Sequence, residues 1–173
     1  MKPRLFIFSG LPGTGKTTLA KAVAKSYKAA YLRLDTIEHG LTELCHVNVQ
    51  GEGYRLSYRI ASDNLLIGNH VVADCCNPWD LTRKEWEDVA TQHNGEYINI
   101  EVLCSDKAEH RTRIETREND IRGFVLPDWE NVQNREQHAW RTPIIQIETA
   151  GRRAEECIKE LLRKIEMKTK ELA

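Results

Sequence analysis

The chain has 173 residues, a length that suits one domain able to bury most of the surface that its unfolded form exposes. Its content of 40% hydrophobic and 29% charged residues is ordinary for a soluble globular domain and excludes a disordered or fibrous protein. The chain has a formal net charge of -1, whereas most nucleic-acid binders carry an excess of positive charge, so we expect no nucleic-acid partner.

The N-terminal region predicts a strand, a loop and a helix in succession. Residues 4–9 (RLFIFS) form a short continuous apolar run that ends at a glycine, which is typical of a buried parallel strand. A glycine-rich turn follows, and then Leu19, Val23 and Tyr27 recur at helical spacing. We therefore expect a loop that turns directly into a helix.

Two further strands are expected to end at carboxylates. The run over residues 30–34 stops at Asp35, and the run over residues 71–73 stops at Asp74. Between them two segments have helical spacing, and Gly68 is a suitable stop for the second. The helices expected there cover residues 36–44 and 54–67, with a loop over residues 46–53.

The rest of the chain continues to alternate helices with strands. Thr82 and Glu85 make a capping-box pattern that predicts a helix start, and Asp106 with Glu109 makes another. The remaining elements expected are strands over residues 97–103 and 144–148, a polar helix over residues 106–118, a loop over residues 119–128, and helices over residues 129–140 and 152–170.

This alternation predicts an α/β fold in which helices cover both faces of a parallel sheet. Ligands in such folds bind outside the carboxyl ends of the strands. Gly10, Asp35 and Asp74 all fall at that edge, so we expect the chemistry there. No repeat, low-complexity tract or linker divides the chain, so residues 1–173 are expected to form a single domain.

The strongest motif is a phosphate-binding loop. Residues 10–17 (GLPGTGKT) match G-x-x-x-x-G-K-[ST] between a predicted strand and a predicted helix. Glycines let consecutive backbone N–H groups surround phosphate oxygens, and the helix N-terminus adds partial positive charge. We expect Lys16 to reach the β- and γ-phosphates of ATP and Thr17 to bind Mg²⁺. The nucleotide-binding residues expected are Gly10, Leu11, Pro12, Gly13, Thr14, Gly15, Lys16, Thr17 and Thr18.

ATP is expected rather than GTP, because the chain contains no N-K-x-D sequence, which reads guanine. Residues 120–123 (DIRG) do match the D-x-x-G of GTPases. They fall in a polar loop after a helix rather than at the end of a buried strand, so we interpret this match as a coincidence.

Phosphoryl transfer to a hydroxyl needs a carboxylate that aims the hydroxyl and takes its proton. Asp35 is the candidate base, although it could also cap the helix that begins at Thr36, and the two roles are compatible. Asp74 closes an apolar strand and is expected to orient Mg²⁺ or its waters. Its alternative role is to cap a turn before Pro78.

Four arginines gather in a segment that could form a lid, approximately residues 106–128. Guanidinium groups suit multidentate contact with phosphate, and Arg113 and Arg117 are spaced to share one helix face. The alternative is a solvated helix in which the arginines pair with nearby glutamates. We expect about half of the four to contact phosphate. The four are Arg111, Arg113, Arg117 and Arg122.

The five cysteines are odd in number and lack any C-x-x-C spacing, which argues against a disulfide framework or a zinc site. Cys75 and Cys76 are expected to be small buried residues. No apolar stretch approaches the length of a membrane span, and the run over residues 5–8 is too short for a signal peptide. We therefore expect no membrane partner and a cytoplasmic location; the sequence indicates no oligomeric state.

Together these features resemble the P-loop kinase families that include chloramphenicol phosphotransferase, zeta-type toxins and polynucleotide 5′-hydroxyl kinases. The resemblance covers nearly the whole chain. It rests on FSGLPGTGKTTLA at residues 8–20, RLD at residues 33–35, VVADCCN at residues 71–77 followed by Arg83 and Trp86, and the arginine-bearing lid.

The resemblance implies a P-loop fold with a five-stranded parallel sheet in the order 2-3-1-4-5. It also implies that Lys16 and Thr17 bind ATP and Mg²⁺ and that Asp35 is the acceptor-side base. Arg113 and Arg117 would belong to the lid.

The function expected is an ATP-dependent kinase that phosphorylates a hydroxyl of a small molecule. A polynucleotide 5′-hydroxyl kinase is a further alternative. Polynucleotide kinases are similar but typically have an arginine three residues after the base, where this sequence has Glu38, and this difference argues against a nucleic-acid acceptor. An alternative from another class is a nucleotide-dependent ATPase switch or partner-binding protein. Side chains from His39 to Tyr58, together with Trp79, are expected to shape the acceptor pocket.

Overall fold

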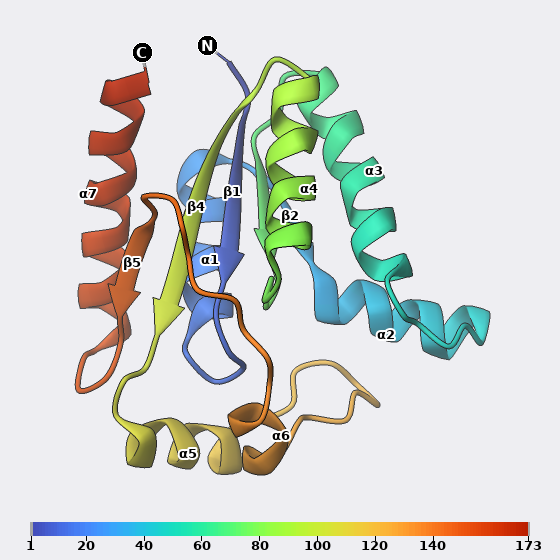
Figure 1. Cartoon of the computed structure of the whole chain (residues 1–173), viewed down its shortest axis with the longest axis vertical. Helices are drawn as coiled ribbons and strands as arrows, with labels where there is room; N and C mark the ends of the chain where they lie inside the picture. Colours follow the sequence, from blue (N-terminus) through green and yellow to red (C-terminus); the bar gives the residue numbers. More distant parts are fainter. Residues whose placement is uncertain (1, 173) are drawn as a thin grey trace.

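Five parallel strands form one sheet in the order β2-β3-β1-β4-β5 within residues 2–172, the part of the chain that this computed structural model describes (Figure 1). Strand β1 lies in the centre and pairs with β3 on one side and β4 on the other. Both the parallel sheet and its order are confirmed. The strands are β1 (Arg4–Ser9), β2 (Ala30–Arg33), β3 (Val71–Asp74), β4 (Glu96–Leu103) and β5 (Ile145–Glu148).

The helices of the described residues cover both faces of the sheet and its carboxyl edge. Helices α1 and α7 pack on one face, α3 and α4 pack on the other, and α5 and α6 lie beyond the strand ends (Figure 1). None of them is both long and apolar enough to cross a bilayer. The helices are α1 (Lys16–Tyr27), α2 (Leu34–Cys45), α3 (Glu52–Leu66), α4 (Asp80–Gln92), α5 (Lys107–Thr116), α6 (Trp129–Gln133) and α7 (Ala154–Leu172).

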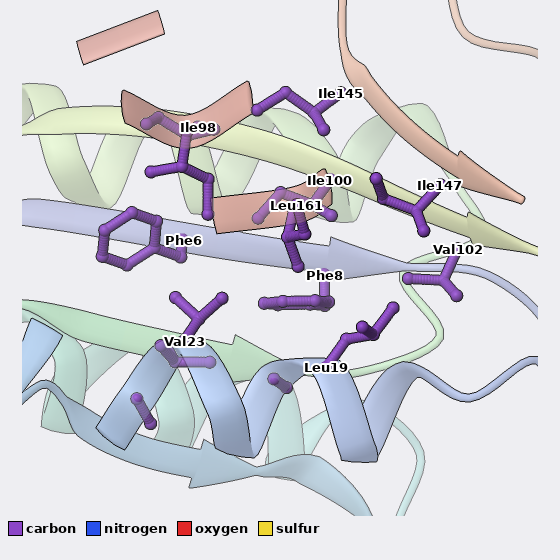
Figure 2. Packing of buried hydrophobic residues seen from close by; sticks show 14 of the residues in the cluster. Phe6, Phe8, Leu19, Val23, Ile98, Ile100, Val102, Ile145, Ile147 and Leu161 are labelled. Atoms are coloured by element: carbon purple, nitrogen blue, oxygen red, sulfur yellow. The ribbon is translucent and has the colours of Figure 1, made fainter. Parts of the chain in front are cut away.

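Strand β1 supplies both hydrophobic cores, because successive side chains of a strand point to opposite faces. Phe6 and Phe8 pack against α1 and α7, as Figure 2 shows for Leu19 and Leu161. Leu5 and Ile7 pack on the other face against α3 and α4. Burial on both faces explains why the β1 sequence is continuously apolar rather than alternating.

The segment around Asp35 differs from the prediction in one respect. Strand β2 ends at Arg33, and α2 begins at Leu34, two residues earlier than expected. Arg33 is therefore the N-cap residue, and the alternative role of Asp35 as a cap is wrong. Asp35 instead lies in the first turn of α2, where the helix N-terminus stabilises negative charge.

The capping predictions have mixed outcomes. Asp106 caps α5 as expected, because its carboxylate accepts hydrogen bonds from two backbone N–H groups of the first turn. The capping box at Thr82 is wrong, because α4 begins at Asp80 and the Thr82 hydroxyl donates to the Trp79 carbonyl at 3.0 Å. Helix α5 ends at Thr116 rather than at residue 118.

The predicted helix over residues 129–140 is too long. Helix α6 ends at Gln133, and the chain that follows is held by hydrogen bonds to α4 and the loop before it. The His138 N–H donates to the Pro78 carbonyl at 2.8 Å, and the Arg83 guanidinium donates to the His138 carbonyl at 2.8 Å. These tertiary contacts outweigh a weak local preference for helix.

Candidate active site

The phosphate-loop sequence forms a tight turn between β1 and α1, with α5 packed directly against it (Figure 1). Gly13 has a φ of +82°, and a Cβ atom there would lie 2.5 Å from Ile114 Cδ1 of α5. The His110 ring of the same helix forms a hydrogen bond of 2.7 Å with the Pro12 carbonyl. Glycine at position 13 is therefore needed both for its backbone conformation and for the close approach of α5.

The Lys16 ammonium group is held across the loop. Lys16 is 7% exposed, and its Nζ donates a hydrogen bond of 2.8 Å to the Leu11 carbonyl. The Thr14 hydroxyl donates to the same carbonyl at 2.9 Å. A buried cation is thus fixed at the N-terminus of α1, where backbone N–H groups and the helix dipole also favour an anion.

A cavity of about 440 Å³ opens above this loop, and we call it the loop cavity. Most predicted site residues line it. They are Pro12, Gly13, Gly15, Lys16, Thr17, Thr18, Asp35, Asp74, Arg113 and Arg117. Gly10, Leu11 and Thr14 lie outside this lining and shape the loop from behind, as when the Gly10 N–H donates to the Cys76 carbonyl at 3.1 Å.

Asp74 and Thr17 bring oxygen donors to the loop cavity. Asp74 is 4% exposed, and its carboxylate accepts a hydrogen bond of 2.6 Å from the Tyr31 hydroxyl. Burial and the neighbouring carboxylate together raise the pKa of Tyr31, which keeps this donor protonated. Carboxylate and hydroxyl oxygens suit Mg²⁺, which usually takes few protein ligands and completes its shell with phosphates and water.

Among the described residues, no group of three or more His, Cys, Asp or Glu side chains could hold a metal ion. Cys75 is buried and Cys76 is half-buried, and all five cysteines are free thiols. The expectation of small buried residues is therefore met by Cys75 and only in part by Cys76.

Arg113 lines the loop cavity, but three of its five N–H donors are already used. Its guanidinium donates to the Thr149 hydroxyl at 2.8 Å, to the Thr149 carbonyl at 2.9 Å and to the Glu109 carboxylate at 2.5 Å. The Thr149 hydroxyl also lies 2.9 Å from the Thr14 carbonyl of the loop. Arg113 thus ties α5 to the loop through Thr149, a residue that no sequence motif identified.

Among the four lid arginines, all of them within the described residues, Arg117 is the one with buried nitrogens that lack a hydrogen-bond partner. It follows the end of α5 in extended backbone, so it no longer shares a helix face with Arg113. Its Nε and one terminal nitrogen are buried without a hydrogen-bond partner, although the side chain lines the loop cavity. Burial lowers the pKa of Arg117, and nearby Asp35 partly offsets this. Buried, unpaired guanidinium nitrogens beside a phosphate loop indicate a position for an anionic ligand.

The other two lid arginines do not reach the cavity. Arg111 is exposed and pairs with Glu115 at 2.7 Å, which is the solvated-helix alternative. Arg122 is also exposed, and neither residue is part of the cavity lining. Two of the four arginines therefore lie at the site.

A salt bridge that the sequence did not suggest closes one side of the loop cavity. The Arg33 guanidinium donates two hydrogen bonds of 2.8 Å to the Asp120 carboxylate, and Lys21 lies 3.3 Å from the same group. The hydrogen bonds from Arg33 lower the pKa of Asp120 to about 2. Nearby, the His39 ring is 2.9 Å from the Arg122 carbonyl. The segment after α5 is thus docked on β2, α1 and α2.

A second cavity of about 580 Å³ adjoins the first, and we call it the side cavity. Asp35, Cys76 and Arg135 line both cavities, so Asp35 lies where they meet. Tyr54 and Trp79 line the side cavity as the sequence suggested, whereas His39 is not part of its lining. Arg135 was missed, because it falls in the segment that was predicted to be helical.

Glu38, one turn after Asp35 on α2, also lines the side cavity. Burial and then the charge of Asp35 raise the pKa of Glu38 to about 7, against the opposing effect of Arg135. A carboxyl group that is part neutral and part ionised near pH 7 therefore lies beside the candidate base.

Comparison with known families and structures identifies relatives of this fold. Residues 5–144 match a family model described as an AAA domain. A comparison with curated proteins finds no match.

Three solved structures illustrate the likeness. A gluconokinase from Sinorhizobium meliloti 1021 is similar over 99% of this chain and 96% of that chain, with 14% identity and a TM-score of 0.69. A sugar kinase from Janibacter sp. HTCC2649 is similar over 95% of each chain, with 16% identity and a TM-score of 0.67. The APS kinase CysC from Mycobacterium tuberculosis, in complex with AMPPNP and APS, is similar over 95% of this chain and 98% of that chain, with 16% identity and a TM-score of 0.66. At such low sequence identity, the structural similarity shows a shared fold alone.

Proposed function

The chain belongs to the AAA domain family, and from this premise we propose that it is an ATP-dependent kinase that phosphorylates a hydroxyl group of a small molecule. Asp35 carries this proposal, because it lines both the loop cavity and the side cavity. A base at that junction can face the γ-phosphate on one side and an acceptor hydroxyl on the other. The three solved structures with this fold are named as kinases, which supports the same reaction class.

The loop cavity suits the phosphates of ATP. The fold implies nucleotide binding, and the APS kinase was solved with the ATP analogue AMPPNP. Lys16 and the loop N–H groups would bind the β- and γ-phosphates, and Arg117 would supply its unpaired donors. Thr17 and Asp74 would hold Mg²⁺, which when bound neutralises charge on the transferring phosphate.

Asp35 would act on the acceptor. Its carboxylate takes the proton of the acceptor hydroxyl as that oxygen forms a bond to the γ-phosphorus. The bond between the γ-phosphorus and the β–γ bridging oxygen breaks, and ADP leaves with the electron pair. The first turn of α2 holds the Asp35 side chain at the junction of the two cavities, where it can meet the acceptor hydroxyl.

A polynucleotide acceptor fits this site less well. The side cavity contains the carboxylates of Asp35, Glu38 and Asp128 and the single cation Arg135. A phosphodiester backbone would meet net repulsion there, in a protein whose formal charge is already -1. We therefore propose a small-molecule acceptor and no nucleic-acid partner.

The direct test is a screen of hydroxyl-bearing metabolites with γ-labelled ATP and Mg²⁺. We expect label in a phosphate ester, and a rate that falls by about 10²–10³-fold in Lys16→Ala, since one preorganised donor to the phosphates is removed. Label that appears only as inorganic phosphate, whatever acceptor is added, would favour the ATPase alternative and contradict the kinase.

A further inference from the structure

We propose that the acceptor carries a protonated amine as well as its hydroxyl group, and that Glu38 selects this class. The inference rests on the kinase function proposed above and deepens it. The Glu38 carboxyl lines the side cavity beside Asp35, is half-buried, and has no hydrogen bond or ion pair within residues 2–172. A half-buried carboxyl group whose acceptor atoms are unused is available to pair with a ligand in the side cavity.

The charge of the side cavity selects the sign of that ligand. Three carboxyl groups, those of Asp35, Glu38 and Asp128, face one cation, Arg135. Arg135 is exposed and also lines the loop cavity. An anionic acceptor would be repelled by the carboxylates, and a neutral one would leave Glu38 with only the exposed Arg135 as a counter-charge. An ammonium group satisfies both the charge and the unused acceptor atoms.

The position of Glu38 is built by its neighbour on α3. A Cβ atom at Gly53 would lie 2.2 Å from Glu38 Cγ and 2.8 Å from a Glu38 carboxylate oxygen. Any larger residue at position 53 would therefore displace the Glu38 side chain. The absence of a side chain there lets Glu38 lie against the start of α3 rather than extend into solvent.

Three aromatic side chains in the wall of the side cavity could also contribute to binding of an ammonium group. Tyr54, Trp79 and Phe124 come from α3, the loop before α4 and the segment after α5, and all three line the side cavity. Aromatic faces attract ammonium groups and pack against the carbon skeleton of a ring compound. A volume of about 580 Å³ is ample for an acceptor of one or two rings.

The titration of Glu38 supports the same reading. Burial and Asp35 raise the pKa of Glu38 to about 7, Glu52 of α3 acts in the same direction, and Arg135 opposes them. The Glu38 carboxyl group is therefore part neutral at neutral pH. A bound ammonium group would favour the ionised form and form a charge-assisted hydrogen bond with it.

The test compares acceptors that differ mainly in charge. Transfer from Mg²⁺–ATP is measured as kcat/KM for glucosamine, glucose and glucuronate, and for an aminocyclitol against inositol, within a wider panel of amine-bearing, neutral and anionic hydroxyl compounds. We expect kcat/KM for each amine-bearing compound to exceed that of its neutral partner by about 10-fold or more. Glu38→Gln should reduce this preference by about 10- to 100-fold, whereas Glu38→Asp should keep part of it.

Glu43→Gln is the matched control, because Glu43 lies on the same helix with an exposed side chain outside both cavities. It should leave the preference unchanged. Preference for neutral or anionic acceptors, or an amine preference that survives in Glu38→Gln, would overturn the role of Glu38 and leave the kinase standing. If Glu38→Gln does not fold, the preference of the wild-type protein decides. Hydrolysis of ATP with no transfer to any compound would overturn the kinase and this inference together.

Discussion

The loop cavity and the side cavity meet at Asp35 and differ in charge and in origin. The loop cavity has six cationic side chains and four carboxylates, and most of its phosphate-facing backbone comes from one continuous segment. The side cavity has three carboxylates and one cation, and its walls come from segments far apart in the chain. Local sequence therefore specifies the half of the site that suits phosphate, and tertiary structure assembles the half that suits the acceptor.

Removal of the shared carboxylate should give the largest effect. Asp35→Asn keeps the shape of both cavities but cannot take a proton, so transfer should fall by about 10²-fold or more. ATP affinity should stay within about threefold, because the phosphates are bound by the loop. Single-turnover rates and equilibrium ATP binding would measure the two quantities.

The exposed carboxylate of Asp63 on α3 provides a control, and Asp63→Asn should change neither quantity. If Asp35→Asn transfers phosphate at the wild-type rate, Asp35 is not the base.

Arg117 tests the cationic half. Arg117→Met removes unpaired buried donors, so ATP affinity should fall by about 10- to 100-fold. The nucleotide-free protein should become more stable by about 1 kcal/mol, because a partly desolvated charge has been removed. Denaturant unfolding without Mg²⁺–ATP measures the gain in stability, and unfolding with Mg²⁺–ATP measures the loss of ATP affinity.

Arg111→Met, which removes an exposed arginine of the same segment, should leave ATP affinity unchanged. Equal losses of ATP affinity in the two variants would contradict a specific role for Arg117.

The pH dependence of stability tests the role of Glu38 in the side cavity. Its pKa rises from its usual 4.5 to about 7 on folding, so the folded protein binds more protons than the unfolded chain between those values. The wild type should therefore lose stability relative to Glu38→Gln as pH rises from about 4.5 to about 7. The difference should reach about 1–2 kcal/mol at pH 8, since Glu38 is only half-buried, and should vanish near pH 4.

Unfolding of both proteins by urea at a series of pH values measures this difference. A difference that does not depend on pH would show that Glu38 titrates normally in the folded protein.

The Arg33–Asp120 pair should give the smallest effect. Asp120 is 53% exposed in its side chain, so Asp120→Asn should reduce stability by less than about 1 kcal/mol. The pKa of Asp120 is lowered on folding, so this contribution is present above about pH 4 and is lost as pH falls towards 2. Hydrogen exchange of residues 119–128 should increase more than that of β1, and equal changes would contradict local docking of this segment.

The sequence predicted the sheet and the phosphate loop because both depend on local pattern. The apolar runs identify buried strands, and the loop motif lies in consecutive residues. Residues 134–140 were predicted as helix, because the hydrogen bonds that prevent it come from Arg83 and Pro78 more than 50 positions away. The Arg33–Asp120 pair spans 87 positions and has no local signature.

The acceptor half of the site was less predictable for the same reason. Glu38 drew notice only as a departure from polynucleotide kinases, and its burial depends on Gly53 of another helix. Arg135 reaches the site because α6 ends early. Such residues are recognised by position in space rather than by spacing along the chain.

The most direct test of the whole account is equilibrium dialysis of the folded protein against labelled ATP with Mg²⁺. We predict one ATP bound per chain, and loss of most of this binding in Lys16→Ala, because the buried ammonium group at the loop is gone. Wild-type protein with intact secondary structure that retains no ATP, or Lys16→Ala that binds ATP equally well, would contradict the account.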